Sequence, residues 1–575
     1  MNKIIRADTR TRQVTLCPVT EEEMHWGGRG LIAHVLLREV PPNCEVLGRR
    51  NKLIIAMGLL ADTNVTTTGQ TSIGGKSPLT RGVKEANVGG GAGKRLARLG
   101  IRALIVEDLP KEPRTDILEV DARGARFVEA PELKGLLVDE TVAALRAKYG
   151  EKVGIYCIGP AGEMLLFGAG IASPNDGDEQ IRFAGRGGLG ALMGSKGLKA
   201  IVVDDAHTTY KTPIADPALL NETAKWMSQA LLAHPKTENR NLFGTPAILA
   251  LANSSGLMPT RNFSSGSFEL ADNINGETVR ETILSRKGKT GRPCVPGCVI
   301  QCSNVFVNET GGKTVASLQY ENISLLGSNC GIGNLDDIAE LNHLCNQVGV
   351  DAIETGAAIG VAMEAGLLAF GDAEGAKDLV RQIGAGTYLG RILGNGAALT
   401  GQVFGVRRVP VIKGQAIPGY DPRGVKGNGV TYITSTMGAD HTAGNAFETL
   451  SYMNVLDKQG QVDISRALQI RASLLDTLGL CLFVRPPFLK KPENFGKLLE
   501  GRYGWKMGER EVVALSFDTI KTEREFNRRA GVSEEHFPIP EFMVDEPLPP
   551  KNAVFDVPME EMSAMWEGYE PDKLL

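Results

Sequence analysis

The sequence lacks the features that mark several large classes of protein. Its start, Met1 to Arg6, has no apolar core of a signal peptide, and no apolar run approaches the roughly 18 residues of a transmembrane helix. Lysine and arginine number 63 against 67 aspartates and glutamates, so no basic surplus predicts nucleic-acid binding. Internal repeats and low-complexity tracts are absent. We therefore expect a cytoplasmic protein that binds neither nucleic acid nor a membrane.

Cysteine is scarce, with 9 in 575 residues, and three of the nine lie close together. Cys294, Cys298 and Cys302 are spaced C-x3-C-x3-C, and an odd total with one tight group favours metal ligation over disulfides. Pro296-Gly297 excludes a regular helix, so a loop around a metal is expected. Three such thiolates fit an iron–sulfur cluster, whereas zinc usually shows C-x2-C pairs. Three buried free thiols remain the alternative.

A cluster of this kind needs a fourth ligand from elsewhere in the chain. The candidates are Cys330, Cys345 and Cys481. Cys345 lies on the apolar stripe of a predicted helix, which favours a core position. Cys481 follows Asp476-x-x-Gly479, where the glycine permits a close approach and the carboxylate needs a partner.

Glycine is abundant, at 69 of 575 residues, and two glycine-rich segments look like anion cradles. The first, from Gly74 to Lys94, combines bare backbone with cations but fails the P-loop pattern. The second, Gly185-Arg-Gly-Gly-Leu-Gly190, satisfies G-x-G-x-x-G, yet 178–184 is not a convincing buried strand before it. A phosphate-bearing cofactor is therefore favoured over an NAD site, and loops chosen only for packing are the alternative.

The chain divides into three predicted domains. Residues 1–210 are expected to be β-rich, with hairpins at Lys3–Leu16 and Leu118–Val128 and a buried strand at Leu53–Met57. Residues 211–415 and 416–575 are expected to be mainly helical, because apolar residues recur at helical spacing, as in Leu335–Val348. Together these features predict a multidomain α+β fold.

Several short motifs occur in an order typical of one known family. The chain resembles the tungsten-dependent aldehyde:ferredoxin oxidoreductases over most of its length. The motifs that carry this resemblance are Gly27-Gly-Arg-Gly30, Lys76-Ser-Pro-Leu-Thr80, Asn87-Val-Gly89-Gly90, Gly185–Gly190, the cysteine triplet, Tyr320-Glu321, Leu326–Gly331, Gly349-Val-Asp351 and Asp476-x-x-Gly479-Leu480-Cys481.

The resemblance implies an N-terminal domain of two β-sheets that carries two pyranopterin dithiolenes and is covered by two helical domains. It further implies a tungsten or molybdenum atom held by the pterin sulfurs, Mg²⁺ linking the two pterin phosphates, and a [4Fe-4S] cluster. An anaerobic enzyme acting on a small molecule is implied, with ferredoxin or a ferredoxin-like Fe-S subunit as electron partner. A homodimer is left open.

The same resemblance assigns individual residues. Asn87 and Gly89 would contact the phosphate and Mg²⁺ of one pterin, and Arg186 with Gly187 those of the other. Asp351 and Asp476 would accept hydrogen bonds from the two pterin rings. Cys481 would join the triplet as cluster ligand. The cofactor-binding set is completed by Lys76, Gly90, Arg182, Gly185, Asn346, Val350 and Leu480.

Glu321 and His441 match the family's acid and base. We expect Glu321 to activate a water that converts a hydrated aldehyde to the acid, and His441 to hydrogen-bond the substrate oxygen or relay the proton. The alternatives are a helix-surface carboxylate and a satisfied buried histidine. Glu340 and His343 match an E-x-x-H that binds a bridging metal in some members, with an ordinary helix face as the alternative.

The chain departs from the family pattern at several positions. Its cysteine spacing has one residue more than the common C-x2-C-x3-C. Gln70, Met437 and Ala443 stand where cationic contacts occur, and Asn346 where an aspartate meets the pterin. The reduced charge leaves two other functions open: a low-potential reductase subunit acting on aryl-CoA or another activated acid, and a non-catalytic Fe-S electron-transfer subunit.

Overall fold

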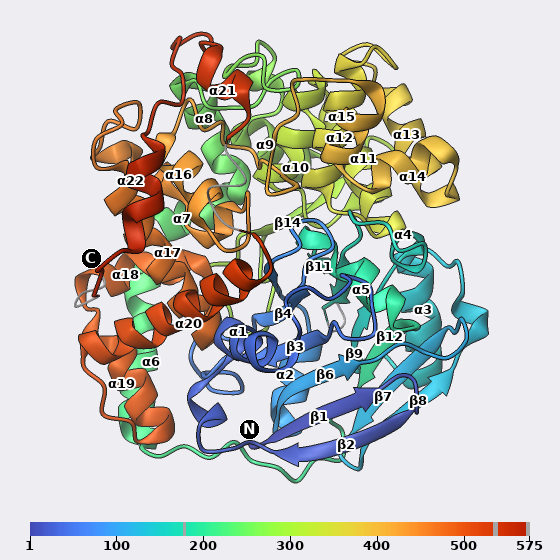
Figure 1. Cartoon of the computed structure of the whole chain (residues 1–575), viewed down its shortest axis with the longest axis vertical. Helices are drawn as coiled ribbons and strands as arrows, with labels where there is room; N and C mark the ends of the chain where they lie inside the picture. The colour runs from blue at the N-terminus through green and yellow to red at the C-terminus, as the bar shows by residue number, and fades with distance from the viewer. Residues whose placement is uncertain (176–179, 533–538, 571–575) are drawn as a thin grey trace.

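Two six-stranded sheets form the N-terminal third of the chain (Figure 1). The computed structural model describes residues 1–175, 180–532 and 539–570. One sheet has the strand order β2-β1-β6-β3-β4-β5 and the other β11-β10-β9-β12-β7-β8. Their strands are β1 (Lys3–Asp8), β2 (Gln13–Pro18), β3 (Leu53–Met57), β4 (Thr71–Lys76), β5 (Val83–Val88), β6 (Ile101–Glu107), β7 (Asp116–Asp121), β8 (Gly124–Glu129), β9 (Gly154–Cys157), β10 (Ile171–Pro174), β11 (Ile181–Ala184) and β12 (Leu198–Val203).

Short helices lie between these strands. They are α1 (Gly28–Glu39), α2 (Ala92–Arg98), α3 (Val138–Tyr149), α4 (Pro160–Glu163) and α5 (Leu189–Ser195). Apolar residues of both sheets, including Ile55, Leu104 and Ile201, pack with α2 and α5 in one core. Burial of this apolar area is the main force that joins the sheets.

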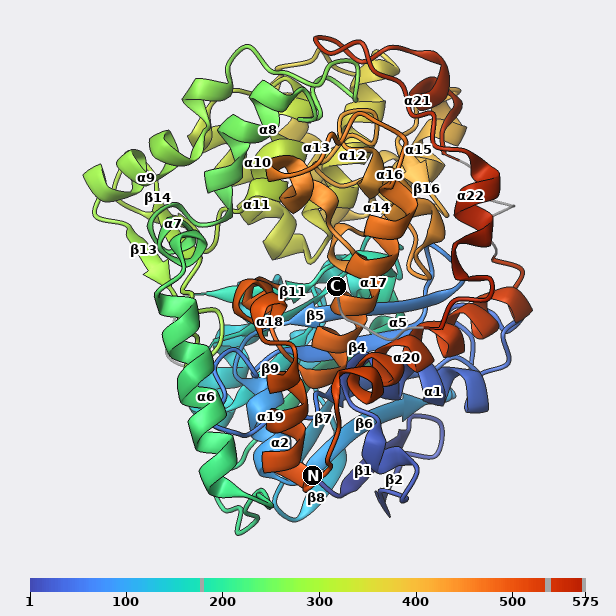
Figure 2. The same cartoon turned by 90° about the vertical axis from the view of Figure 1, so that its left-hand side faces the viewer.

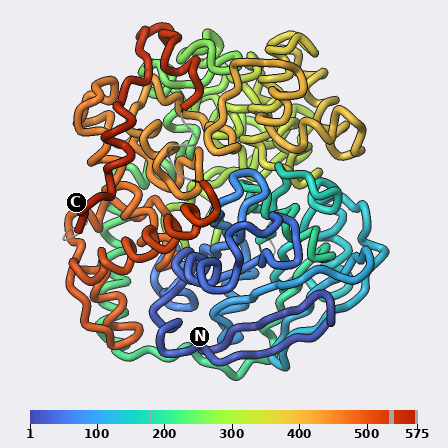
Figure 3. The backbone as a smooth tube through the Cα atoms, viewed as in Figure 1, coloured from blue at the N-terminus to red at the C-terminus, as the bar shows by residue number. Residues whose placement is uncertain are grey.

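The rest of the chain is mainly helical and lies over the sheets (Figure 3). Its helices are α6 (Pro217–Leu232), α7 (Pro235–Phe243), α8 (Leu249–Ser255), α9 (Gly276–Ser285), α10 (Tyr320–Leu326), α11 (Leu335–Val348), α12 (Ala352–Glu364), α13 (Ala373–Ala385), α14 (Tyr388–Gly394), α15 (Ala397–Phe404), α16 (Lys426–Thr434), α17 (Gln461–Leu478), α18 (Arg485–Lys490), α19 (Glu493–Tyr503), α20 (Glu509–Arg529), α21 (Glu541–Asp545) and α22 (Met559–Ser563). Two small sheets interrupt it: β13 (Lys289–Arg292), β14 (Ser303–Val307) and β15 (Lys313–Val315), and β16 (Val411–Ile412) with β17 (Gln415–Ala416). The predicted α+β fold is confirmed; the boundaries at 210 and 415 stay predictions.

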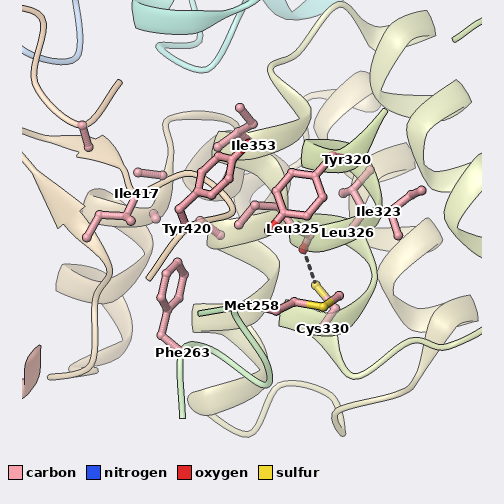
Figure 4. Packing of buried hydrophobic residues seen from close by; sticks show 14 of the residues in the cluster. Met258, Phe263, Tyr320, Ile323, Leu325, Leu326, Cys330, Ile353, Ile417 and Tyr420 are labelled. Atoms are coloured by element: carbon pink, nitrogen blue, oxygen red, sulfur yellow. Dashed lines mark hydrogen bonds between the residues drawn. The ribbon is translucent and has the colours of Figure 1, made fainter. Parts of the chain in front are cut away.

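The helical region has its own core, in which α10 and α12 pack closely. The ideal Cβ of Gly356 would lie 2.6 Å from the carbonyl oxygen of Leu325, so only glycine allows this approach. Figure 4 shows Tyr320 and Tyr420 side by side in this core, with the Cys330 thiol donating to the Leu325 carbonyl oxygen at 3.3 Å. Cys330 is thus a core residue.

Glycines also fix the end of α17 against the first sheet. An ideal Cβ on Gly58 would lie 2.3 Å from the Cα of Gly479, so the two backbones meet only because both residues are glycine. The amides of Leu59 and Leu60 donate to carbonyls in the last turn of α17. Gly479 ends the helix in the left-handed region (φ 76°), which directs Cys481 away from the helix axis.

Within the described residues, no single helix is long and apolar enough to cross a membrane. Helix α17 and the following segment Leu482–Lys490 reach that length and hydropathy only when they are taken together, and the two are bent by 116° relative to one another.

Candidate active site

A cavity of about 430 Å³ lies where the first sheet, the second sheet and the helical region meet. Segments far apart in the sequence supply its walls. Among the lining residues are Gln70, Asn87, Gly89, Arg182, Gly185, Arg186, Cys294, Glu321, Asn346, Val350, Asp351, His441, Asp476, Leu480 and Cys481.

The loop after β11 places Arg186 in the wall. Its guanidinium donates to the carbonyl oxygens of Ala416 and Ala439, both at 2.6 Å, and to Asp351 Oδ2 at 3.3 Å. Gly187 has φ 83°, and a Cβ there would lie 2.3 Å from the side chain of Lys84, so the loop needs glycine. Strand β11 pairs antiparallel to β10, which is not the parallel β-α-β context of a dinucleotide site.

Asp351 begins α12 and faces the cavity. Its Oδ1 accepts from the amide of Ile353 at 3.0 Å, an N-cap arrangement. One helical turn further, buried Glu354 accepts from the amides of Ala397 (3.0 Å) and Ala416 (2.8 Å). Burial raises the pKa of Glu354 to about 7, opposed by Arg186. Glu354 therefore fixes the strand whose carbonyl oxygen Arg186 binds.

Asp476 lies opposite, in the last turn of α17. It accepts from Asn87 Nδ2 at 2.7 Å and from the Arg29 guanidinium at 3.3 Å. Arg29 is itself held by Glu523 at 2.8 Å. Burial raises the pKa of Asp476 to about 6, with Arg29 and Asn87 opposing the rise. The carboxylate is thus satisfied by hydrogen bonds while it borders the cavity.

Glu321 and His441 lie next to one another in the cavity wall. Glu321 Oε2 accepts from the amide of Gly419 at 2.8 Å, and Oε1 lies 3.5 Å from His441 Nε2. Burial raises the pKa of the Glu321 carboxyl, and His441 opposes this. The His441 ring lies 5.6 Å from the ring of Tyr420. A proton acceptor and a hydrogen-bonding imidazole thus share one wall.

A buried ion pair holds His441 in place. Asp440 is bound by the ammonium of Lys84, and both side chains are nearly inaccessible to solvent. Despite burial, Lys84 and Arg186 keep the pKa of Asp440 well below its usual range. Asp440 also accepts from the amide of Thr442 at 2.9 Å, so it fixes the backbone on both sides of His441.

The four thiols predicted as cluster ligands gather beside this cavity. Cys294, Cys298, Cys302 and Cys481 pack in one cluster of side chains, and Cys294 and Cys481 also line the cavity. Burial and the neighbouring thiols raise the pKa of Cys302 to about 12 and of Cys298 to about 11. Cys345, by contrast, lies in the helical core with Cys330.

The loop that carries Cys294, Cys298 and Cys302 lies close to Gly89 and Gly90. Thr66 accepts from the amide of Val299 and donates to the Gly297 carbonyl oxygen. A Cβ on Gly89 would lie 2.7 Å from the carbonyl oxygen of Cys294, which also accepts from the Gly90 amide. Backbone amides donate to Cys298 (from Ile300 and Gln301) and to Cys481 (from Phe483, 3.5 Å). Such bonds are typical of iron–sulfur ligands.

Some predicted residues do not line the cavity. Lys76 donates to the carbonyl oxygens of Pro42 and Cys44, and its cofactor contact stays a prediction. Gly90 and Gly187 shape the loops behind the lining residues. Glu340 pairs with Lys377 and Arg381, and no group of three metal-binding side chains in the described residues is placed to hold a single ion.

Sequence reasoning missed the residues that position the site. The sequence patterns did not indicate four of them: Lys84, Asp440, Glu354 and Arg29. Asp440 nevertheless directly precedes His441, and Arg29 lies within the motif Gly27–Gly30. Their partners lie far away in the chain: 356 residues separate Lys84 from Asp440. No local sequence pattern indicates an ion pair between residues so far apart in the chain.

The residues fit the implied cofactors. Within the described part of the chain, Glu321 Oε1, His441 Nδ1 and Arg182 Nε are buried at this cavity without a hydrogen-bond partner, as expected of atoms that face a polar group. Burial and the neighbouring thiols raise the pKa of Cys298, Cys302 and Cys481, so a bound metal cluster would stabilise these thiols as thiolates. In a [4Fe-4S] cluster each thiolate binds a different iron, so the four need not converge on one ion.

The fold and this set of residues favour a redox enzyme. Two family models cover the chain: "Aldehyde ferredoxin oxidoreductase, N-terminal domain" matches residues 4–205, and "Aldehyde ferredoxin oxidoreductase, domains 2 & 3" matches 222–569. The chain belongs to the aldehyde ferredoxin oxidoreductase family and is an oxidoreductase.

Individual relatives agree with this assignment. The tungsten-containing aldehyde ferredoxin oxidoreductases of Pyrococcus furiosus and Thermococcus kodakarensis are each 32% identical over 95% of this chain and 92% of their own length. The WOR-like subunit of an aliphatic sulfonate oxidoreductase from Pyrococcus furiosus is 26% identical over 87% of this chain and 82% of its own. The active-site complex BamBC of benzoyl-coenzyme A reductase shares the fold, with a TM-score of 0.78 at 19% identity over 94% of this chain and 90% of that one.

Proposed function

We propose that this chain is a tungstopterin and [4Fe-4S] oxidoreductase that oxidises aldehydes to carboxylic acids, or catalyses the reverse, with a ferredoxin-like electron acceptor. The observation that carries the proposal is the Glu321–His441 pair, 3.5 Å apart, in a cavity that also borders Cys294 and Cys481. Proton-transfer groups and electron-transfer ligands thus border one space.

The cofactor-binding residues divide into two sets. Asn87, Gly89 and Asp476 would hold one pterin, and Gly185, Arg186 and Asp351 the other, with Arg182, Asn346, Val350 and Leu480 completing the wall. Mg²⁺ would lie with the phosphates. The bound group would supply two-electron redox chemistry at its tungsten or molybdenum, and the cluster at the four cysteines single-electron transfer.

Glu321 is placed to act as general base. Its Oε2 is fixed by the Gly419 amide, which leaves Oε1 to accept a proton from a water or an aldehyde hydrate. Because burial raises its pKa, this carboxylate is a stronger base than an exposed one. His441 would donate a hydrogen bond to the substrate oxygen, oriented by the Lys84–Asp440 pair below it.

Glu321→Gln tests this assignment. Because glutamine cannot accept the proton, kcat for aldehyde oxidation with a viologen dye should fall by roughly 10²–10⁴-fold. Iron and tungsten contents should match those of the unmodified enzyme. Glu132→Gln, at an exposed carboxylate on the β-rich domain, is the matched control and should retain full activity. Full activity in Glu321→Gln would contradict the assignment.

The alternative function is a low-potential reductase acting on aryl-CoA or another activated acid. This alternative is supported by three uncharged residues that stand where the family has cationic ones: Gln70, Met437 and Ala443. Gln70 lines the cavity. Viologen-coupled assays in both directions separate the two functions: the proposed one predicts aldehyde oxidation, and the alternative predicts oxidation of reduced viologen by the acyl thioester with no aldehyde turnover. A non-catalytic electron-transfer subunit predicts neither.

A further inference from the structure

Helices α7 and α18 both lie next to α6 on one side of the molecule (Figure 2). The exposed lysines on and beside them form a basic surface, and Cys481 directly precedes the turn Leu482–Val484 that leads into α18. We define this α7–α18 surface by five exposed residues: Leu232, Lys236, Leu489, Lys490 and Lys491. Leu232, the last residue of α6, and Leu489, on α18, are 62% and 48% exposed. Lys236 lies four positions after Leu232, and Lys490 directly follows Leu489. The surface thus has an apolar part with a cationic rim.

Contacts show that these residues converge. His234 accepts from the Lys236 amide at 3.2 Å at the start of α7, and its pKa is lowered by burial and then by Lys236 and Lys490. The Lys491 ammonium lies 6.0 Å from the ring of Trp226 on α6, which places α18 against α6. Helix α6 contacts both α7 and α18, so Lys236, Lys490 and Lys491 lie on adjoining segments.

Positive charge continues beneath this surface. Glu448, the carboxylate that faces His234, is bound by Arg240 and Arg485 at 3.3 and 3.2 Å. Two exposed carboxylates lie close in sequence to the three lysines: Glu238 on α7 and Glu493 at the start of α19. Because Glu448 is paired with arginines, the exposed charge of this surface remains positive.

A short path joins this surface to the cluster ligands. Arg240 lies one helical turn after Lys236 on α7 and stacks at 4.0 Å on the ring of Phe483. The Phe483 amide donates to Cys481 Sγ at 3.5 Å. The Arg240–Phe483 pair therefore connects the lysines with a predicted cluster ligand, and Arg240 also interacts with Cys302.

We propose that the α7–α18 surface docks a small acidic one-electron carrier protein, which takes electrons from the cluster. This proposal rests on the proposed function. Lysines steer an acidic partner to the surface, and two exposed leucines give a small apolar contact of the kind that permits rapid release. Oxidation of one aldehyde with one water yields the acid, two protons and two electrons, so two carrier molecules are each reduced by one electron and the protons pass to solvent.

Charge reversal on the holoenzyme tests the proposal. The probe is a plant-type [2Fe-2S] ferredoxin of strongly negative charge, and methyl viologen serves as a small cationic comparison. In Lys236→Glu/Lys490→Glu, kcat/KM for ferredoxin at low salt should fall by about tenfold or more, while the rate with methyl viologen does not fall. Added salt should slow ferredoxin reduction by the unmodified enzyme and leave the variant nearly unaffected.

The control is Lys134→Glu, an exposed lysine on the β-rich domain, which should leave both rates unchanged. An unchanged ferredoxin rate in the double variant, or equal losses with ferredoxin and viologen, would overturn the proposal. Isothermal titration of ferredoxin into each protein gives a readout that needs no turnover: the double variant should bind at least tenfold more weakly than the unmodified protein. Equal binding, or none to the unmodified protein, also overturns the docking surface, whereas absent aldehyde turnover with viologen refutes the proposed function instead.

Discussion

At the scale of single residues, the buried charges of this site occur in matched pairs. Lys84 binds Asp440, Arg186 lies against Asp351, and Arg29 is held by Glu523. A buried charge without a partner is strongly unfavourable, so each pair fixes two distant segments relative to one another. Glu321 Oε1, His441 Nδ1 and Arg182 Nε differ from these pairs because, in the described chain, none of the three atoms has a hydrogen-bond partner. Unsatisfied polar atoms beside satisfied ones indicate the reacting position.

The pH dependence of the reaction should report Glu321. A general base must be ionised, so activity is lost as pH falls through its pKa. Burial raises that pKa above the ordinary value of 4.5, and the acidic limb of the kcat/KM profile should therefore lie at higher pH than for an exposed glutamate. Viologen-coupled assays across the acidic range measure it. An acidic limb at the ordinary glutamate value, or the same limb in Glu321→Gln, would contradict this role.

The Lys84–Asp440 pair should matter for stability as well as orientation. Lys84→Met leaves the Asp440 carboxylate buried without its ammonium and should destabilise the fold by about 3–5 kcal/mol. Adding Asp440→Asn removes the uncompensated charge while keeping an oxygen for the Thr442 amide, so the double variant should recover much of the loss. Thermal unfolding of Lys84→Met, Asp440→Asn and the double variant, compared with the unmodified protein, measures the coupling. Equal stability of Lys84→Met and the unmodified protein would show that the pair is dispensable.

At the scale of helices and strands, the local pattern of apolar residues predicted some elements correctly. Alternating apolar residues predicted the hairpin around Gly124, now β7 and β8, and helical spacing predicted α11 with the bounds Leu335–Val348. Both signals depend on neighbours in sequence. The connection of β3 to the end of α17 had no such signal, because it depends on two glycines 421 positions apart that allow the backbones to touch.

That glycine contact gives a prediction for cluster assembly. Gly58→Ala places a Cβ 2.3 Å from the backbone of Gly479, so the end of α17 must move and Cys481 with it. The iron content of the purified variant should fall well below that of the unmodified enzyme. Gly508→Ala is the control, since its Cβ would meet only the flexible Glu511 side chain at 3.0 Å. Full iron content in Gly58→Ala would show that Cys481 does not depend on this contact.

At the scale of the whole molecule, the cavity forms because both sheets and the helical region each contribute a wall. Residues 87, 186, 321, 351, 441 and 476 meet there, although no two lie within 20 positions of each other. The order of short motifs indicated the family and hence most of these residues. It could not give the strand order of the sheets or the ion pairs behind the wall, because those result from long-range packing rather than from local sequence.

The central claim is that one cavity holds a tungstopterin beside an iron–sulfur cluster. The most direct test is metal analysis of protein purified without oxygen, combined with the electron paramagnetic resonance spectrum of the reduced form. We predict about four irons and one tungsten or molybdenum per chain, with a [4Fe-4S] signal that is lost in Cys481→Ser. Iron without tungsten or molybdenum, or a cluster signal unchanged in Cys481→Ser, would contradict the account.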